Sequence, residues 1–387
     1  MKDKQIRFTN WPVVCTMLWI ATLSSPVLAV KEIDMTLMMT GSAFAADEIM
    51  VERVIGSEEP GAYKHPCTVT ELDNGDLYIA YYGGTGEYQD DSKVWGMRKT
   101  KGSSSWSVPE CIADTPFHGE GNPVVWQAPD SIVWLFYVQR YGDTWSDSRI
   151  KAKVSNDGAK TWSDSFMLTF QRGMMVQGLP IVLNDGTYLL PAYYETGHDR
   201  EKTDPDTASL FFHINPRAKT WTETGKIFSD NGNLQPHAVQ LTDDHLVAYC
   251  RRGGSFDPLP DGRIIRAESR NGGKTWSRGT PSQFRNPNAA IAFIKLHNGH
   301  LLLVYNDSIA ERTPLTVSVS TDNDTTWAYK RNIAESDETQ TFAYPVAIQS
   351  RNGKMHVVCT TDVRKTILHF TFDEEAVLSH PTKRNTQ

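Results

Sequence analysis

Pairs of short hydrophobic stretches, each pair joined by a polar turn, recur along the chain. In the first pair, the stretches 68–72 and 77–82 flank Asn74-Gly75. Asn-Gly and Asp-Gly favour a two-residue hairpin, because both central residues adopt positive φ there. The pattern returns about every 55 residues, which indicates a repeat architecture. Its turns lie at Asn74-Gly75, Pro129-Asp130, Asp185-Gly186, Asp243-Asp244, Asn298-Gly299 and Asn352-Gly353.

A second sequence mark recurs in phase with the hairpins. The segments Ser155–Trp162, Ser269–Trp276 and Ser320–Trp327 share a Ser, an Asp or Asn, and a final Thr-Trp, and degenerate versions end at Trp106 and Trp221. The Asp or Asn side chain can accept hydrogen bonds from the backbone of its own turn, while Thr and Trp pack on a neighbouring strand. The mark therefore predicts a structured turn in each repeat.

These repeats predict an all-β fold, a six-bladed β-propeller that forms one domain over residues 48–376. Four-stranded units cannot bury both faces alone, and six of them around an axis close a ring with short, protected edges. Met50–Ile55 or Ile367–Phe372 is expected to supply the strand that seals the ring, and residues 377–387 read as a loose tail. A seven-bladed ring with one irregular blade remains an alternative.

The first residues read as a leader segment that spans residues 1–45. A basic start at 2–7 and an apolar run at 11–30 are followed by Ala43-Phe44-Ala45, a typical cleavage signal. Cleavage near Leu28-Ala29, a later start at one of the methionines 35, 38 or 39, and a retained membrane anchor are alternatives. We expect a secreted or periplasmic protein with no integral membrane span after the leader is removed.

Composition narrows the classes of function. The net charge is −7 and no block of like charge occurs, so a nucleic-acid partner is not expected. The four cysteines after the leader form no CxxC pair and read as free thiols, three of them buried in strands. With no HExxH motif, no calcium loop and no glycine-rich phosphate loop, the sequence predicts neither a metal site nor a cofactor.

The Ser–Trp segments resemble Asp-boxes, also called BNR repeats, and the chain as a whole resembles the sialidase superfamily, in particular its bacterial exo-α-sialidase-like branch. The clearest stretch runs from Arg285–Ala290 through Leu302–Asn306 and Arg312–Val317 to Tyr344-Pro345. The resemblance implies a glycan substrate whose carboxylate is held by three arginines. It also implies a tyrosine nucleophile activated by a glutamate, and an aspartate that serves as acid and base. Guanidinium groups bind carboxylates in bidentate fashion, and a neutral phenol does not repel an anionic substrate.

The three arginines carry over only in part. The first normally stands in an Arg-Ile-Pro motif, where this chain has Lys64-His65-Pro66. By the same resemblance the second is Arg251 or Arg252, and the third is Arg312. Lys64 or His65 then stands near the place of the first arginine, which this chain lacks.

The reacting groups carry over less directly. The resemblance offers Tyr344 as the nucleophile, two residues beyond the family position and on the same strand face. It offers Glu268 as the glutamate, and Asp91, beside Asp90 in the loop after the first hairpin, as the acid and base.

Two histidines offer a different chemistry. His65 and His237 both stand at the start of the first strand of a repeat. We therefore expect their imidazoles to face one another across an axial pocket. A histidine in such a pocket can act as a base or an acid. Polar side chains at similar strand ends suit the recognition of sugar hydroxyls: Asn122, Gln177, Asn286, Asn288 and Asn306.

Three hypotheses of function follow from these residues. The first is an exported glycoside hydrolase that removes a terminal acidic sugar from a glycan. The second is a histidine-based enzyme, a hydrolase or a lyase, that cleaves uronic-acid glycans. The third is a propeller that binds glycans without cleaving them, because Asp-boxes support the fold rather than catalysis.

Overall fold

The computed structural model describes residues 49–58, 60–200, 202–336 and 340–382. Every described residue belongs to one compact unit, Ser42–Gln387. The leader expected at 1–45 lies outside the described residues. Of the helices in the described part, none is long and apolar enough to cross a membrane.

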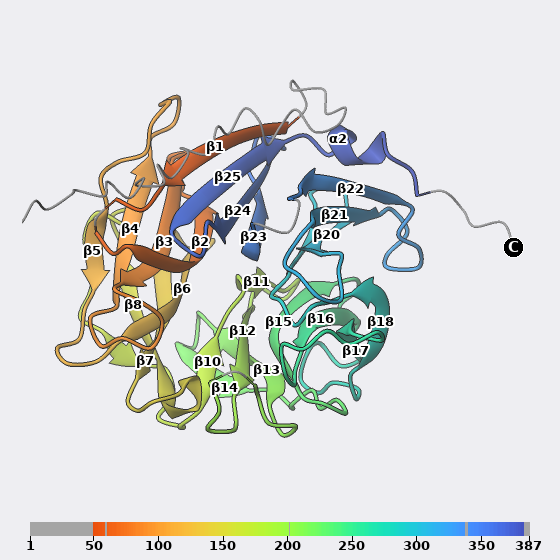
Figure 1. Ribbon diagram of the computed structural model, residues 1–387, viewed down its shortest axis with the longest axis horizontal. Helices are drawn as coiled ribbons and strands as arrows, with labels where there is room; N and C mark the ends of the chain where they lie inside the picture. The colour runs from red at the N-terminus through yellow and green to blue at the C-terminus, as the bar shows by residue number, and fades with distance from the viewer. Residues whose placement is uncertain (1–48, 59, 201, 337–339, 383–387) are drawn as a thin grey trace, which may run out of the picture. The chain divides into compact units, whose positions relative to one another are not determined.

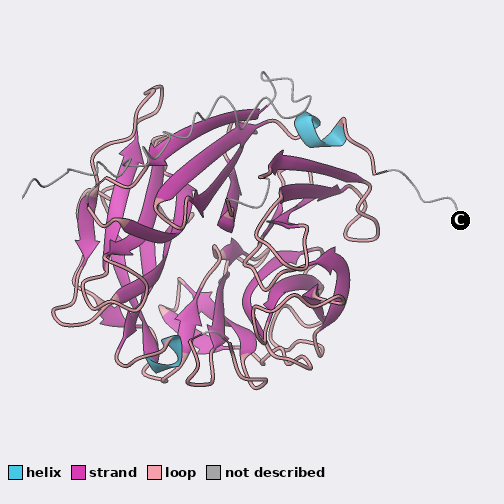
Figure 2. Cartoon of the chain, viewed as in Figure 1, coloured by secondary structure: helices cyan, strands magenta, loops and turns pink. Residues whose placement is uncertain are grey.

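The described strands form six antiparallel sheets that surround an axis as the blades of a propeller, which confirms the predicted fold (Figure 1). Figure 2 shows that strands make up almost all of the regular structure. We number the blades I to VI in chain order and give their strands from the axis outward. Blade I contains β2 (Tyr63–Glu71), β3 (Leu77–Gly84), β4 (Lys93–Lys99) and β5 (Glu110–Ala113). Blade II contains β6 (Glu120–Gln127), β7 (Val133–Arg140), β8 (Ser148–Ser155) and β9 (Phe166–Met167), with the short helix η1 (Trp145–Asp147) before β8.

The remaining blades follow the same plan. Blade III contains β10 (Met174–Val176), β11 (Ile181–Val182), β12 (Tyr188–Tyr194), β13 (Ala208–Asn215) and β14 (Thr220–Glu223). Blade IV contains β15 (Asn233–Gln240), β16 (Leu246–Arg252), β17 (Arg263–Ser269) and β18 (Thr280–Arg285). Blade V contains β19 (Ala292–Lys295), β20 (Leu301–Asn306), β21 (Leu315–Ser320) and β22 (Tyr329–Ala334). Blade VI contains β23 (Ala343–Gln349), β24 (Met355–Thr361), β25 (Thr366–Phe372) and β1 (Ile49–Ile55).

Both strands proposed to seal the ring belong to the last blade. β1 pairs antiparallel with β25 in the register Ile49↔Phe372 and Arg53↔Leu368, so the N-terminal strand completes a sheet built from C-terminal strands. Polar side chains of β1, β25 and blade I also bind one another at this seal. Glu52 accepts hydrogen bonds from Lys99 of blade I at 2.7 Å and lies 2.6 Å from the His369 ring.

The hairpin turns behave as their sequences predict. Gly75 and Gly186, the second residues of an Asn-Gly and an Asp-Gly turn, have φ of 86° and 82°, in the region that favours glycine. At the same end of the blades, side chains near the ends of inner strands bind the turn of an adjacent blade. Gln127 accepts from the Asp73 amide at 3.3 Å, and Glu71 accepts from the Arg351 amide at 2.8 Å across the seal.

The Asp-box turns hold neighbouring blades together. In the turn between β21 and β22, Asp322 accepts from the Thr326 amide at 2.8 Å and from the Thr326 hydroxyl at 2.6 Å. The box tryptophans pack on the preceding blade: Trp162 lies against Tyr78 of blade I, and Trp276 stacks on Phe211 of blade III with ring centroids 4.8 Å apart. The repeated mark is thus an element of blade-to-blade packing.

Apolar cores fill the spaces between blades. Between blades I and II, for example, Tyr78 and Val94 are buried with Val125 and Leu135. Cys67, Cys250 and Cys359 are buried free thiols, as predicted, and Cys111 is exposed.

Beyond the last strand, the described part of the expected loose tail packs on blade V. In the helix α2 (Glu375–Leu378), the carbonyl of Ala376 accepts from Arg331 at 2.8 Å. The Thr382 amide then binds the carbonyl of Ala328 at 2.7 Å. Residues 377–382 are therefore held in place by hydrogen bonds.

Candidate active site

A cavity of about 140 Å³ lies at the end of the propeller axis where the inner strands begin. Each blade contributes one residue near the start of its inner strand, and these six are His65, Asn122, Met175, Gln235, Asn288 and Tyr344. Loops from the outer parts of the blades complete the wall. The convergence follows from the ring closure, because segments distant in sequence reach one axis.

A local backbone device turns several of these side chains into the cavity. Asn122, Gln235 and Tyr344 have φ of 43°, 53° and 53°, and the strand register shifts at each of these positions. Each residue directly precedes a proline, which has no amide hydrogen for the strand ladder. Bulges of this kind redirect a side chain, and strained backbone is concentrated at functional sites.

The hydroxyl of Tyr344 is held by two donors. Nη1 of Arg251 donates to it at 2.9 Å and Nε2 of Gln235 at 3.2 Å. Arg251 is itself fixed, because its Nε donates to Asn288 Oδ1 at 2.6 Å and its Nη1 to Gln235 Oε1 at 3.2 Å. Asn288 also donates to the carbonyl of Gly254 at 3.0 Å. It therefore both lines the cavity and positions Arg251.

The charge around Tyr344 favours the phenolate. Burial by itself would raise the pKa of this phenol, but the guanidinium groups of Arg251 and Arg312 and the hydrogen bond from Gln235 bring it below the ordinary value of 10. The guanidinium carbon of Arg312 lies 5.5 Å from the centre of the Tyr344 ring. The phenol is thus activated by cations, and the amide of Gln235 contacts it where the resemblance led us to expect a carboxylate.

Besides Arg200, one more arginine lines the cavity although the sequence did not point to it, and this is Arg364. It lies in the turn between β24 and β25, where Asp362, Val363 and Arg364 all have positive φ. Its side chain lines the cavity, donates to the Tyr63 hydroxyl at 3.2 Å and forms an ion pair with Glu87. The sequence carried no signal for it, because neither Gly nor Asn marks this left-handed turn.

The sequence also did not point to the carboxyl groups of the cavity wall, which belong to Glu87, Glu195 and Asp199. Glu87 follows β3, accepts from the Tyr63 hydroxyl at 2.9 Å and binds the Trp145 indole nitrogen at 3.3 Å. Glu195 directly follows β12. Burial raises the pKa of Glu195 to about 7, with Arg251 lowering it and Glu87 raising it further. A carboxyl with such a pKa can give or take a proton near neutral pH.

His65 is at the cavity, as predicted. Its Nδ1 lies 2.7 Å from Thr360 Oγ1, and its ring meets the Tyr344 ring edge-on with centroids 4.2 Å apart. Burial, together with Arg364, Arg312 and Arg251, holds the pKa of His65 well below its usual value. The imidazole is therefore neutral at physiological pH.

The prediction that His237 faces His65 is wrong. His237 lines a different cavity, at the end of the axis where the inner strands finish. The residue that corresponds to His65 is the one before the proline, Gln235, because the bulge at that position turns it inward while His237 continues the strand. Burial lowers the pKa of His237 to about 4.

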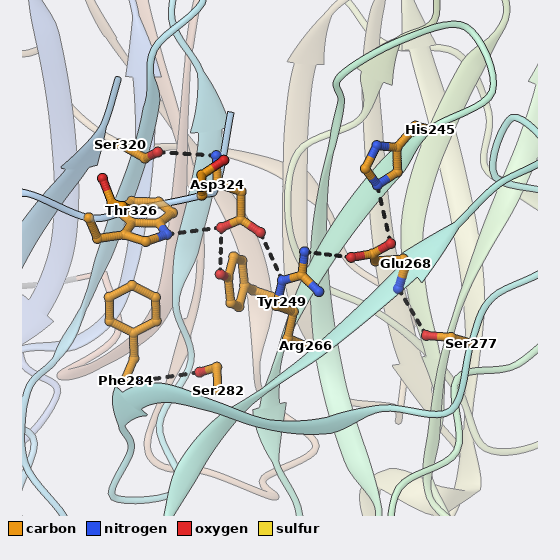
Figure 3. Close-up of polar contacts among 12 residues, drawn as sticks. His245, Tyr249, Arg266, Glu268, Ser277, Ser282, Phe284, Ser320, Asp324 and Thr326 are labelled. Carbon is orange, nitrogen blue, oxygen red and sulfur yellow. Dashed lines mark hydrogen bonds and ion pairs between the residues drawn. The ribbon is translucent and has the colours of Figure 1, made fainter. Parts of the chain in front are cut away.

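Glu268 is also outside the cavity wall, and Figure 3 shows the network of polar contacts to which it belongs. Glu268 lies on β17, the third strand of blade IV. Its carboxylate binds Arg266 at 2.7 Å and lies 3.3 Å from the His245 ring. Arg266 in turn binds Asp324 of the neighbouring Asp-box at 2.8 Å. This network joins blades IV and V, so the expected pairing of Glu268 with Tyr344 does not occur.

The expected acid, Asp91, is used inside its own loop. Its carboxylate accepts from the Thr85 amide at 3.2 Å and from the Thr85 hydroxyl at 3.1 Å. Asp90 pairs with Arg140 at 2.8 Å. Neither side chain lines the cavity, and both are held by these contacts instead.

Of the predicted basic residues, two do not reach the cavity. Arg252 donates to the carbonyls of Asn286, Ser255 and Asp257, and so fixes the loop that carries Phe256. Lys64 is buried and donates to the carbonyls of Glu58 and Gly61 at 2.8 and 2.5 Å. The structure thus selects Arg251 from the pair that the sequence left open.

Three of the predicted amides lie elsewhere. Asn286 closes a turn with Ala289, and Asn306 donates to the carbonyl of Phe342 at 3.1 Å between blades V and VI. Gln177 is buried outside the cavity wall. Over the described ranges, no group of three or more His, Cys, Asp and Glu side chains is arranged to hold a metal ion.

Fold and pocket together define a sialidase-like β-propeller. The chain belongs to the BNR repeat-like domain family, whose model matches residues 75–357. No curated protein sequence matches it. Among solved structures it is similar to a Hadza microbial sialidase, at 16% identity and a TM-score of 0.71 over 85% of this chain and 69% of that one.

Two further solved structures share the fold. A leech intramolecular trans-sialidase has 12% identity and a TM-score of 0.69, over 85% of this chain and 71% of that one. A protein of unknown function from Dyadobacter fermentans has 16% identity and a TM-score of 0.65, over 83% of this chain and 98% of that one. At these identities the likeness establishes the fold, and the chemistry has to be argued from the pocket.

Proposed function

We propose that the protein is a glycoside hydrolase that removes a terminal acidic sugar from a glycan, with Tyr344 as the nucleophile. One observation carries the proposal: guanidinium groups, among them those of Arg251, Arg312 and Arg364, line one small cavity with a phenol whose pKa is lowered. Such a cluster suits a substrate carboxylate, because guanidinium groups bind carboxylates with charge-assisted hydrogen bonds. Arg251 and Arg312 are the best placed, since Arg364 is already paired with Glu87.

In the first step, the phenolate oxygen of Tyr344 attacks the anomeric carbon and the glycosidic carbon–oxygen bond breaks. Glu195, protonated, gives its proton to the departing oxygen. In the second step, Glu195 takes a proton from water, the resulting hydroxide attacks the same carbon, and the bond to Tyr344 breaks. The enzyme returns to its starting state, and the configuration at the anomeric carbon is retained.

We assign the acid and base to Glu195 rather than Asp91. Glu195 lines the cavity with Tyr344 and has a pKa near 7, whereas Asp91 is bound to Thr85 outside it. The protein is further proposed to be exported, on the strength of its basic and apolar N-terminal sequence. The N-terminal sequence of the mature protein, read after expression in the native host, tests that point.

The test of the main proposal is a Tyr344→Phe variant. The purified protein is screened against sialosides and uronic-acid oligosaccharides, and the released acidic sugar is measured. Phe keeps the ring against His65 and removes the nucleophile, so turnover should fall at least about a thousandfold. A Tyr305→Phe variant, which changes a core phenol of blade V, is the matched control and should retain activity. Unchanged turnover in Tyr344→Phe would dismiss the mechanism.

A second candidate is favoured by the contact between His65 and Tyr344. A neutral imidazole can abstract the proton beside a carboxylate that arginine has neutralised, so that the carbon–oxygen bond to the next sugar breaks and a double bond forms. The product of such an elimination absorbs ultraviolet light, and a hydrolysis product does not. A His65→Ala variant that still makes an absorbing product would exclude this role for His65.

A further inference from the structure

An exposed group of aromatic side chains lies near the cavity, in the connection from blade I to blade II and just after β7. The side chain of Phe117 is 90% exposed, and that of Tyr141 is 47% exposed. His118 follows Phe117 in the chain, and its ring centroid is 5.0 Å from that of Tyr141. We call Phe117, His118 and Tyr141 the aromatic strip. Phe117 has φ of 66°, a conformation that is strained for a bulky residue.

The strip is continuous with the cavity wall. Tyr141 begins the connection from β7 to β8, and Trp145 of the same connection lines the cavity. The other side of the strip is joined to the cavity through Arg140. Its guanidinium group donates to the carbonyl of Tyr88 at 2.8 Å, and its backbone amide donates to the carbonyl of Gly119 at 3.0 Å. Tyr88 lines the cavity and packs on Trp145, with ring centroids 5.3 Å apart.

Polar groups lie beside the Tyr141 ring. The guanidinium carbon of Arg149 lies 5.2 Å from the centre of the Tyr141 ring, and the Tyr141 hydroxyl donates to Gln139 Oε1 at 3.1 Å. Flat aromatic faces beside donors and acceptors suit a sugar ring, which presents apolar C–H faces and polar hydroxyl edges. A purely apolar partner would leave these polar groups unpaired.

We propose that the aromatic strip binds the sugar residues on the leaving side of the cleaved bond, so that the enzyme prefers an acidic sugar at the end of an oligosaccharide chain. This inference rests on the proposed function, because it takes the cavity as the place of the terminal sugar. The strip then extends recognition beyond the cavity along blade II.

The test compares a Phe117→Ala/Tyr141→Ala double variant with the unaltered full chain. Two substrates that carry the same acidic sugar are used, a methylumbelliferyl glycoside and a longer oligosaccharide. With the oligosaccharide KM should rise about tenfold, because two stacking faces are lost. With the methylumbelliferyl glycoside kcat/KM should stay within about twofold.

Phe170→Ala is the matched control, because Phe170 is 80% exposed on the connection that follows β9 of the same blade. It should behave as the unaltered chain with both substrates. Equal losses with both substrates, or no loss with either, would overturn the inference.

If the full chain cleaves neither substrate, calorimetric titration with the oligosaccharide separates the two proposals. A Kd about tenfold weaker in the double variant than in Phe170→Ala would support the strip although the hydrolase proposal had failed. Equal Kd values, or no binding by the unaltered chain, would overturn it.

Discussion

At the residue scale, the environment of Tyr344 differs from that of an ordinary buried tyrosine. Two donors point at its oxygen, from Arg251 and Gln235, and a second guanidinium group lies over its ring. Elsewhere in the molecule burial raises phenol pKa values, as it does for Tyr78, to about 12. The difference arises from charge, because the two guanidinium groups outweigh the loss of solvation at Tyr344.

Glu195 should control the pH dependence of the reaction. With a pKa of about 7 it is protonated below that pH, so kcat/KM should fall as the pH rises through 7. Glu195→Gln should remove this dependence and lower kcat about a hundredfold on a natural glycan. The loss should be smaller with a methylumbelliferyl leaving group, which needs less protonation.

Asp199→Asn is the control, since Asp199 also lines the cavity. It should keep the pH profile of the unaltered protein, and a Glu195→Gln profile with the same fall near 7 would contradict the assignment. The carboxyl also affects stability, because its pKa is higher in the folded state than its ordinary 4.5. It therefore destabilises the fold as the pH rises from 4.5 to about 7, and Glu195→Gln should flatten that slope.

At the scale of the elements, two structural features recur from blade to blade, one at each end of the blades. Asp-box turns and glutamine side chains near the turns link blades at one end, while bulges before proline open the other end into a cavity. Asn122, Gln235 and Tyr344 share that bulge although their side chains differ. The strand therefore provides a fixed position, and the residue placed there sets the chemistry.

The Asp-box of blade V should contribute measurably to stability. Asp322 accepts hydrogen bonds from Ser320 at 2.9 Å, and from the amide and hydroxyl of Thr326. Asp322→Ala should lower the free energy of unfolding by about 1–2 kcal/mol, because it leaves those donors without their acceptor. Thermal and urea denaturation measure the change.

Asp322→Asn is the matched control for that experiment. Asn271 stands at the same position of another box, and its Oδ1 accepts from the Thr275 amide at 2.9 Å. The Asn variant should therefore lose less than half as much stability as the Ala variant. Equal losses would show that charge, rather than the acceptor geometry, stabilises the turn.

At the scale of the whole molecule, the ring is sealed by pairing the two ends of the described chain. A chain of polar contacts crosses this seal, from Lys99 through Glu52 and His369 to His356. Burial opposes ionisation of Glu52, but His369 and Lys99 bring its pKa down from 4.5 to about 2. Burial, His369 and Lys99 lower the pKa of His356 to about 3.

The seal should weaken in acid. Glu52 stabilises the fold above its unfolded pKa of 4.5, and this contribution disappears as the pH falls toward 2. Glu52→Gln should lower the free energy of unfolding at pH 7 by about 1–2 kcal/mol, less than the full shift implies because the side chain is partly exposed. Its deficit should shrink as the pH falls below 4.5.

Glu58→Gln is the control, since Glu58 forms an exposed ion pair with Arg53 near the same strand. It should change the free energy of unfolding by less than about 0.5 kcal/mol. A Glu52→Gln deficit that stays constant between pH 7 and pH 3 would contradict the role assigned to this carboxylate. His356, neutral in the fold, adds to the acid sensitivity between pH 6.5 and about 3 in both proteins.

The sequence by itself determined the architecture and part of the site. Hairpin turns and Asp-boxes are local, because the residues that form each one are neighbours in the chain, so their recurrence predicts six blades before any contact is known. Four residues of the cavity wall could be predicted for a similar reason, because each lies in or next to a recognisable motif: His65, Arg251, Arg312 and Tyr344.

Only the tertiary structure decided which polar groups share the axis. Arg364, Glu87 and Glu195 come from turns and strand ends with no motif of their own, and they meet Tyr344 because the ring closes. A single bulge separates Gln235, which faces the cavity, from His237, which does not. Glu268 binds Arg266 and Asp91 binds Thr85, and neither carboxylate reaches the axis. The partner of a charged side chain is the opposite charge or donor that the fold places next to it, and the order of residues alone does not reveal that partner.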